Sequence, residues 1–395
     1  MRTRLPGACF DPTGRWMVTA NIKDAALWPL SVPQARVLSG SPDALRSLAF
    51  TPNGEAIVSL SAAGEVRVWP LSPASAERSR DVFRGAGGGD AWLAIDPEGR
   101  RIAVPSDTFK GPLVVPLGGG SVQKFAGFSE TAAVNTFAFS QDGRRLAAAP
   151  YAGTPRDKVV RIYDLETGEV QVVGPVPGAG ETFKGGISSL TFLDQDLLLA
   201  GAQQVGLVLF DLRNGQTRVL TPEVEIVRGI SRRQRFGIGV RYKSWTPRHA
   251  EIVRFDLDDF KVRPLASHGD LIGYGSAVLD PTETLVASAS EDGTVRIGPV
   301  DSEEPHYFFG HESLVGDLAF SPDGHWLASA GSDKTIRLWP VPDASERPFH
   351  TLPREELLAK LRALTNLRAV AAPGTASGYK IEAGPFPGWA KVPEW

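Results

Sequence analysis

Short apolar segments separated by tight turns return along the chain with a period of about 44 residues. In the clearest copy, one segment ends at Phe320, the turn Ser321-Pro-Asp-Gly324 follows, and two further segments cover 327–331 and 336–339. Alternation of apolar and polar residues is typical of a β-strand with one buried face, and Pro and Gly at these positions favour a tight antiparallel link. The pattern therefore predicts a repeated all-β unit.

Eight copies of this unit can be aligned on their first strands, at about residues 5, 45, 91, 134, 187, 226, 273 and 315. The third strand of six copies ends in a large ring, as in Val66-Arg-Val-Trp69, and an outer fourth strand follows. Arg36-Val-Leu38 is the fourth strand expected for the first copy. Four strands in roughly 40–45 residues are typical of one blade of a β-propeller.

These motifs and their spacing resemble the WD-repeat β-propeller family over about residues 5–352. The resemblance implies that each blade is pinned by hydrogen bonds through His, Ser or Thr, Asp and Trp. Only the last copy has all four residues of this structural tetrad: His311, Ser329, Asp333 and Trp339. A buried indole N–H needs an acceptor and a buried carboxylate needs donors, which such a relay supplies. Their spacing is that of a blade pin, which favours a structural role over a hydrolase.

We expect a propeller over residues 1–352, with eight blades and with seven as the alternative. The chain reaches an inner strand near Leu5, and the last copy has a candidate outer strand of its own at Pro348-Phe-His-Thr-Leu352. Eight self-contained blades fit this arrangement. In the alternatives, one weak copy is misread, or Met1 lies within a longer parent chain whose earlier repeats are absent.

Residues 353–395 depart from the repeat and form a tail. An apolar stripe of four leucines over Arg354–Thr365 predicts a short helix after Pro353, followed by an extended segment rich in Pro, Gly and Trp. We expect this tail to pack on the propeller. It resembles the tails of bacterial WD-repeat proteins that often carry a Ser/Thr protein kinase domain upstream. That resemblance implies a bacterial signalling or assembly setting, although the chain has no kinase motif.

The sixth copy contains a long connection between its second and third strands that combines aromatic and basic residues. The residues are Arg241, Tyr242, Lys243, Trp245 and Arg248. Such residue types are favoured at interface hot spots, and an acidic or phosphorylated peptide would suit the cations. We predict a protein-binding site here. In the alternative, Trp245 folds onto a neighbouring loop and the charges are solvated.

Composition reduces the number of functions that the sequence supports. With 42 Lys and Arg against 45 Asp and Glu, nothing indicates capture of nucleic acid. A single cysteine and six scattered histidines predict no disulfide, metal or cofactor, and no apolar run is long enough to span a membrane. We therefore expect a cytoplasmic, non-catalytic scaffold that binds a protein or peptide, with its oligomeric state left open.

Two other functions remain open at this point. In one, the chain is the sensor or docking segment of a larger protein linked to a Ser/Thr kinase. In the other, it is an enzyme that uses the propeller channel, which would require ionisable side chains to converge at the axis.

Overall fold

The computed structural model divides into two compact units, which we call the propeller unit (Arg36–Ala344) and the terminal unit (Met1–Ala35 with Ser345–Trp395). The residues that it describes are 7–10, 16–20, 25–29, 35–72, 79–86, 92–106, 111–129, 133–152, 159–177, 186–245, 248–265, 270–272, 276–301, 305–341, 353, 355–356, 367–371 and 379–383.

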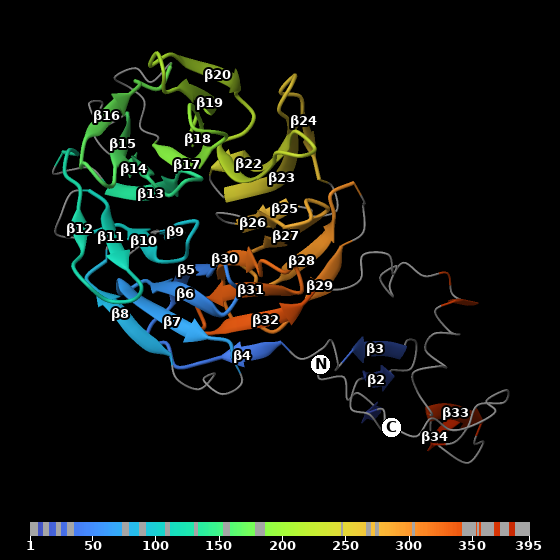
Figure 1. Cartoon of the computed structure of the whole chain (residues 1–395). Coiled ribbons are helices and arrows are strands. Elements are labelled where there is room, and N and C mark those ends of the chain that lie inside the picture. Colours follow the sequence, from blue (N-terminus) through green and yellow to red (C-terminus); the bar gives the residue numbers. More distant parts are fainter. Residues whose placement is uncertain are drawn as a thin grey trace. The chain divides into compact units, whose positions relative to one another are not determined.

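The propeller unit is a ring of seven antiparallel sheets, each with an inner strand, two middle strands and an outer strand (Figure 1). Blades 1 to 3 are β5 (Leu45–Phe50), β6 (Ala56–Ser61), β7 (Glu65–Pro70) and β8 (Arg80–Arg84); β9 (Ala94–Ile95), β10 (Arg101–Val104), β11 (Leu113–Pro116) and β12 (Gln123–Lys124); and β13 (Ala133–Phe139), β14 (Arg145–Ala152), β15 (Val160–Asp164) and β16 (Val170–Val173). Blades 4 to 6 are β17 (Ile187–Phe192), β18 (Leu197–Ala202), β19 (Gly206–Asp211) and β20 (Thr217–Thr221); β21 (Ile226–Ser231), β22 (Phe236–Trp245), β23 (Arg248–Asp256) and β24 (Val262–Pro264); and β26 (Ser276–Leu279), β27 (Leu285–Ala289), β28 (Val295–Pro299) and β29 (His306–Phe308). Blade 7 is β30 (Val315–Phe320), β31 (Trp326–Gly331), β32 (Ile336–Pro340) and β4 (Arg36–Leu38).

The expectation of eight blades is wrong, because the ring closes with seven. Strand β4, expected as the outer strand of the first copy, instead pairs with β32 of blade 7, with Val37 opposite Arg337. The first copy therefore stays outside the ring. The outer strand expected at Pro348–Leu352 lies outside the described residues.

The terminal unit contains a three-stranded antiparallel sheet and a separate hairpin. The sheet is β1 (Gly7–Phe10), β2 (Trp16–Ala20) and β3 (Ala25–Pro29), and the hairpin is β33 (Leu367–Ala371) and β34 (Tyr379–Ala383). The prediction of a short tail helix is also wrong, since every element of the described residues is a strand. Of its expected span, the structure describes Glu355 and Glu356, and both have helical backbone.

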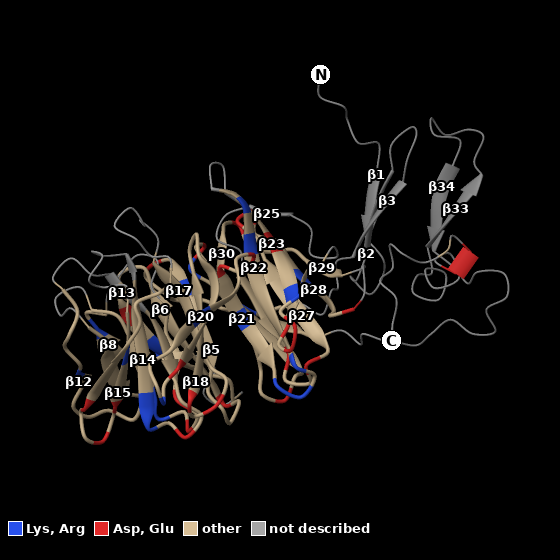
Figure 2. Cartoon of the chain, turned by 90° about the horizontal axis from the view of Figure 1, so that it is seen from above, with Lys and Arg blue, Asp and Glu red and all other residues tan. Residues whose placement is uncertain are grey.

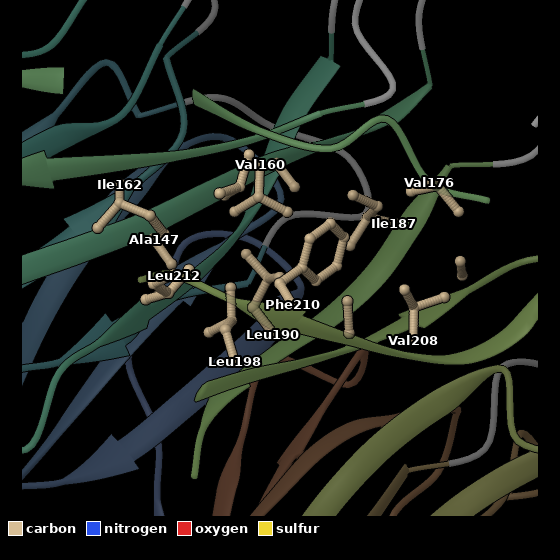
Figure 3. Packing of buried hydrophobic residues seen from close by; sticks show 14 of the residues in the cluster. Ala147, Val160, Ile162, Val176, Ile187, Leu190, Leu198, Val208, Phe210 and Leu212 are labelled. Atoms are coloured by element: carbon tan, nitrogen blue, oxygen red, sulfur yellow. The ribbon is translucent and has the colours of Figure 1, made fainter. Parts of the chain in front are cut away.

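Apolar side chains fill the space between neighbouring blades. Between blades 3 and 4, Phe210 of β19 lies among Val160 of β15, Ile187 and Leu190 of β17, and Leu198 of β18 (Figure 3). All five are buried. Burying such side chains removes apolar surface from water, at roughly 25 cal/mol per Å². The inter-blade layers therefore stabilise the ring and hold its loops in fixed positions.

Tight turns join the inner strand to the second strand, as their Pro and Gly residues predict. Gly54, Gly99 and Gly324 have φ of 71°, 68° and 74°, a conformation that glycine adopts without a Cβ clash. In blades 5 and 6 the positive φ falls on Arg235 and Glu283 instead, at 55° and 63°. Both side chains are held, because Arg235 pairs with an aspartate and Glu283 accepts a serine hydroxyl.

Candidate functional site

The connection predicted as a binding loop in the sixth copy is a β-hairpin arm formed by β22 and β23. The inner strand β21 begins at Ile226, which pairs with Val240, so residues 241–245 of β22 extend past it. They pair with β23, and strand β25 (Asp270–Ile272) joins the other edge of β23 at 249–251. We use the name arm for 241–251. Strand pairing on both sides of β23 makes it part of the blade's framework.

Two cations of the arm, Arg241 and Lys243, are paired within the chain. Arg241 donates to Glu251 at 2.5 Å from Nε and also pairs with Glu223, and Lys243 Nζ lies 3.0 Å from Glu251 Oε2. Basic and acidic residues meet in this part of Figure 2, near β22, β23 and β25. These two carboxylates balance the charges of Arg241 and Lys243, so the two side chains offer little excess charge to an acidic or phosphorylated ligand.

Of the two aromatic residues in the predicted binding site, the structure describes the side chain of Tyr242 and not that of Trp245. Tyr242 is partly buried and packs against the apolar layer between blades 5 and 6. The side chains of Trp245 and Arg248 lie outside the described residues. Arg241, Tyr242 and Lys243 thus lie together on one strand, with Tyr242 turned toward the protein rather than away from it.

The four residues of the predicted tetrad are linked in series within blade 7. Trp339 Nε1 donates to Ser329 Oγ at 2.8 Å, and that hydroxyl lies 2.7 Å from His311 Nε2. His311 Nδ1 lies 2.8 Å from Asp333 Oδ2. When Ser329 directs its proton at His311 Nε2, its oxygen still accepts from the indole, and Nδ1–H of His311 donates to the carboxylate. This arrangement has a neutral imidazole and an ionised Asp333.

Burial supports this assignment of charges. It lowers the pKa of His311 below its usual value, although Asp333 raises it. Burial also raises the pKa of Asp333, but hydrogen bonds from Thr335 and His311 outweigh that effect and lower it overall. Gly331 leaves room for the relay, because a Cβ there would lie 2.4 Å from His311 Nδ1. The tetrad is thus a filled, internally satisfied set of polar groups.

We predict that the propeller loses stability as the pH falls below about 6.5, the usual histidine pKa. Below that pH the unfolded state binds a proton at residue 311 that the folded state excludes, so the free energy of unfolding decreases. For one such group the slope is at most about 1.4 kcal/mol per pH unit. Urea unfolding between pH 7.5 and 5.5 should show a flatter dependence in His311→Gln than in the wild type.

The matched control is His325→Gln, which changes an exposed histidine. This variant should keep the slope of the wild-type protein. An equal flattening in both variants would mean that His311 is not the group responsible.

β-Bulges place polar side chains on the inner strands of the ring. Pairing shifts by one residue just before Ser47, Thr136, Ser189 and Asp317 in four inner strands, and later in the repeat, at Arg228, in β21. A bulge adds an unpaired residue and re-aims its side chain. The bulge residue is Arg228 in β21, and the residue after the bulge is Ser47 in β5 and Asp317 in β30.

The side chains of Arg228, Ser47 and Asp317 come from three different blades and lie together with Trp92, which stands just before β9. We call these four residues the hub cluster. The guanidinium of Arg228 lies 4.5 Å from the centre of the Trp92 ring, and it attracts Asp317 electrostatically. Asp317 accepts hydrogen bonds from Ser47 Oγ at 2.9 Å and from Leu48 N at 3.1 Å. Inner strands of blades 1, 5 and 7, together with the residue just before the inner strand of blade 2, thus converge on one pair of opposite charges.

Burial shifts both ionisable groups of the hub cluster. It raises the pKa of Asp317, against the opposing effect of Arg228 and the N–H of Leu48, and it lowers the pKa of Arg228. Such a pair is the convergence of charge that an enzyme in the channel would require. However, the neighbours of Asp317 act as hydrogen-bond donors, and Ser47 Oγ in turn accepts from Leu93 N at 3.2 Å. A hydroxyl engaged in this way cross-links strands and is poorly placed to act as a nucleophile.

Sequence reasoning missed the hub cluster because it relied on the alternation of apolar and polar residues along each strand. The available signal was a polar residue at one repeated position, occupied by Ser47, Thr136, Ser189 and Asp317. Strict alternation hides this position, since the bulge shifts every later side chain to the other face.

Two further observations concern metal binding and membrane insertion. Within the described residues, no group of three His, Cys, Asp or Glu side chains could hold a metal ion. The same part of the chain contains no helix that is both long and apolar enough to cross a membrane.

Comparison with known families finds WD40 repeats, described as WD domain, G-beta repeat, in four segments: 33–70, 119–164, 262–297 and 303–340. A search of curated protein sequences finds no significant match. Each matched segment begins at or just before the outer strand of one blade and includes strands of the next, so the repeat in the sequence is offset from the blade. The first begins just before β4 and the last ends with β32, the two strands that close the ring.

Proposed function

We propose that the chain, in which four segments of the closed propeller match WD40 repeats, is a non-catalytic scaffold that holds a partner protein through the arm. WD40 propellers generally mediate protein–protein interaction and are generally non-catalytic. The observation that carries the proposal is the arm itself. Its strands β22 and β23 have 10 and 9 residues, more than any other described strand, and β22 extends beyond the inner strand. Binding residues are commonly placed on such extensions of a rigid scaffold.

Arg241 and Lys243 each pair with glutamates of the same chain, and this pairing decides which kind of contact with a partner we propose. Cations that are already neutralised by Glu223 and Glu251 add little attraction for an acidic partner. The contact therefore depends on shape and apolar area, with Trp245 as the anchor. Binding of this kind responds weakly to salt, because screening acts on exposed charges.

The test compares two tryptophans at opposite ends of the blades. We expect Trp245→Ala to lower recovery of partners from an extract of the source cells by at least about tenfold, as for a hot-spot aromatic. Trp326→Ala serves as the matched control, because Trp326 is 40 % exposed and starts β31 at the turn on the other end. Recovery with the wild-type protein should change little between 50 and 300 mM salt.

Equal recovery with Trp245→Ala and the wild-type protein would remove the arm from consideration. A steep fall with salt would instead support an acidic partner. The kinase-linked function receives no support from the comparisons, since the matched segments end at residue 340, before the tail.

A further inference from the structure

At several junctions between blades, the residue that follows the bulge makes a hydrogen bond to the backbone of the next blade or of the residues beside it. Ser47 of blade 1 accepts from Leu93 N beside blade 2, at 3.2 Å. Ser189 of blade 4 accepts from Val227 N of blade 5, at 2.7 Å. At the junction of blades 3 and 4, a hydroxyl again makes the link, from Thr136 to the carbonyl of residue 187 at 3.0 Å.

At the junction of blades 7 and 1, a carboxylate takes the place of the hydroxyl. Asp317 accepts from Leu48 N at 3.1 Å and from Ser47 Oγ at 2.9 Å, both in blade 1. Its other oxygen accepts from Leu318 N at 2.9 Å and lies 3.4 Å from Ser276 Oγ of blade 6. A carboxylate forms stronger hydrogen bonds than a hydroxyl and can accept several at once. This junction is therefore more heavily bonded than the three hydroxyl links.

The junction of blades 7 and 1 is also the one that joins distant parts of the chain. Asp317 and Leu48 are 269 residues apart, whereas Ser189 and Val227 are 38 apart. Closing a longer loop costs more conformational entropy. The backbones approach closely here as well, because a Cβ on Gly316 would lie 3.1 Å from the carbonyl oxygen of Arg46. A stronger link offsets a larger entropic cost at the point where the ring closes.

We propose that Asp317 is the closure lock of the ring, held in place by Arg228, and that it keeps blade 7 joined to blade 1 and so keeps β4 paired. Arg228 supplies the countercharge from blade 5 and rests on Trp92 beside blade 2. Removing either charge leaves the other without its compensating partner, which is destabilising where burial shields the two groups from water.

Hydrogen exchange and thermal unfolding of the full chain test this proposal. For Asp317→Asn we expect a midpoint about 5–10 °C lower and exchange at least about tenfold faster in β4, β5 and β30 than in blades 3 and 4. The matched control, Ser189→Ala, removes a link between consecutive blades and should speed exchange only in β17 and β21. Asp317→Ser, which restores the hydroxyl of the other junctions, should fall between the two.

Several outcomes would overturn the lock. One is a rise in exchange that Asp317→Asn spreads evenly over the seven blades, and another is an Asp317→Ser variant as stable as the wild type. If Asp317→Asn fails to fold while Ser189→Ala folds, the closing junction carries more of the stability than its counterpart, as proposed. The variants Arg228→Gln and Arg228→Gln with Asp317→Asn complete a double-mutant cycle. Strictly additive effects in that cycle would rule out Arg228 as the group that holds Asp317.

Discussion

Removing residues 1–39 should broaden the unfolding transition of the propeller or lower its midpoint by at least about 10 °C, whereas removing residues 1–34 should preserve it. The two truncations differ by β4, which supplies the outer strand of blade 7. Leu38 of this strand is buried in the layer that also contains Trp69 and Leu338, and Arg36 Nη1 donates to Leu71 O of blade 1 at 3.0 Å. Losing a buried leucine and the backbone bonds of a short strand should cost about 5 kcal/mol or more.

Calorimetry together with circular dichroism in urea would measure this difference. The truncation that keeps β4 should melt in one transition, and the one that lacks it should melt broadly or at least 10 °C lower, an order of magnitude expected from such a loss. If both truncations melt alike, another segment completes blade 7 in place of β4, and Pro348–Leu352 would be the first to examine.

Ser329→Ala should destabilise the propeller about twice as much as Ser59→Ala. Ser329 Oγ contacts both Trp339 Nε1 and His311 Nε2, whereas Ser59 Oγ contacts Trp69 Nε1 at 2.8 Å in blade 1. Both serines are buried and each is ten residues before its tryptophan. A buried polar group without a partner costs roughly 1–3 kcal/mol, so we expect about 2–5 kcal/mol for Ser329→Ala and about 1–3 kcal/mol for Ser59→Ala.

Urea unfolding at pH 7.5 checks both variants under the same conditions. Equal losses would mean that the bond between Ser329 and His311 contributes nothing beyond the tryptophan bond. Ser329→Thr, which keeps the hydroxyl, should recover part of the loss if the buried site accommodates the added methyl group.

Sequence reasoning predicted the blades well because each depends on neighbours in the sequence. The first strands anchored near residues 45, 134, 187, 226 and 315 all lie in inner strands, and the turns with Pro and Gly adopt the expected conformation. These features depend on alternation and turn chemistry within about 40 residues.

The number of blades was not predictable in the same way, because it depends on which edge β4 pairs with. After the third strand of the first copy, Arg36–Leu38 has the place that an outer strand has in copies two to seven. Local pattern cannot show that its partner is β32, at the other end of the repeats. For the arm, the sequence indicated a long aromatic and basic segment, but the compensation by Glu223 and Glu251 appears only when β22, β23 and the link between β20 and β21 come together.

The pairing of Val37 with Arg337 joins a strand that is synthesised early to one that is synthesised late. The two residues are 300 positions apart (337 minus 37), so β4 is synthesised long before its partner strand. At roughly 5–20 residues per second, the nascent strand waits about 15–60 s with an open edge. During that interval the growing polypeptide is exposed to chaperones and to aggregation with neighbouring nascent chains.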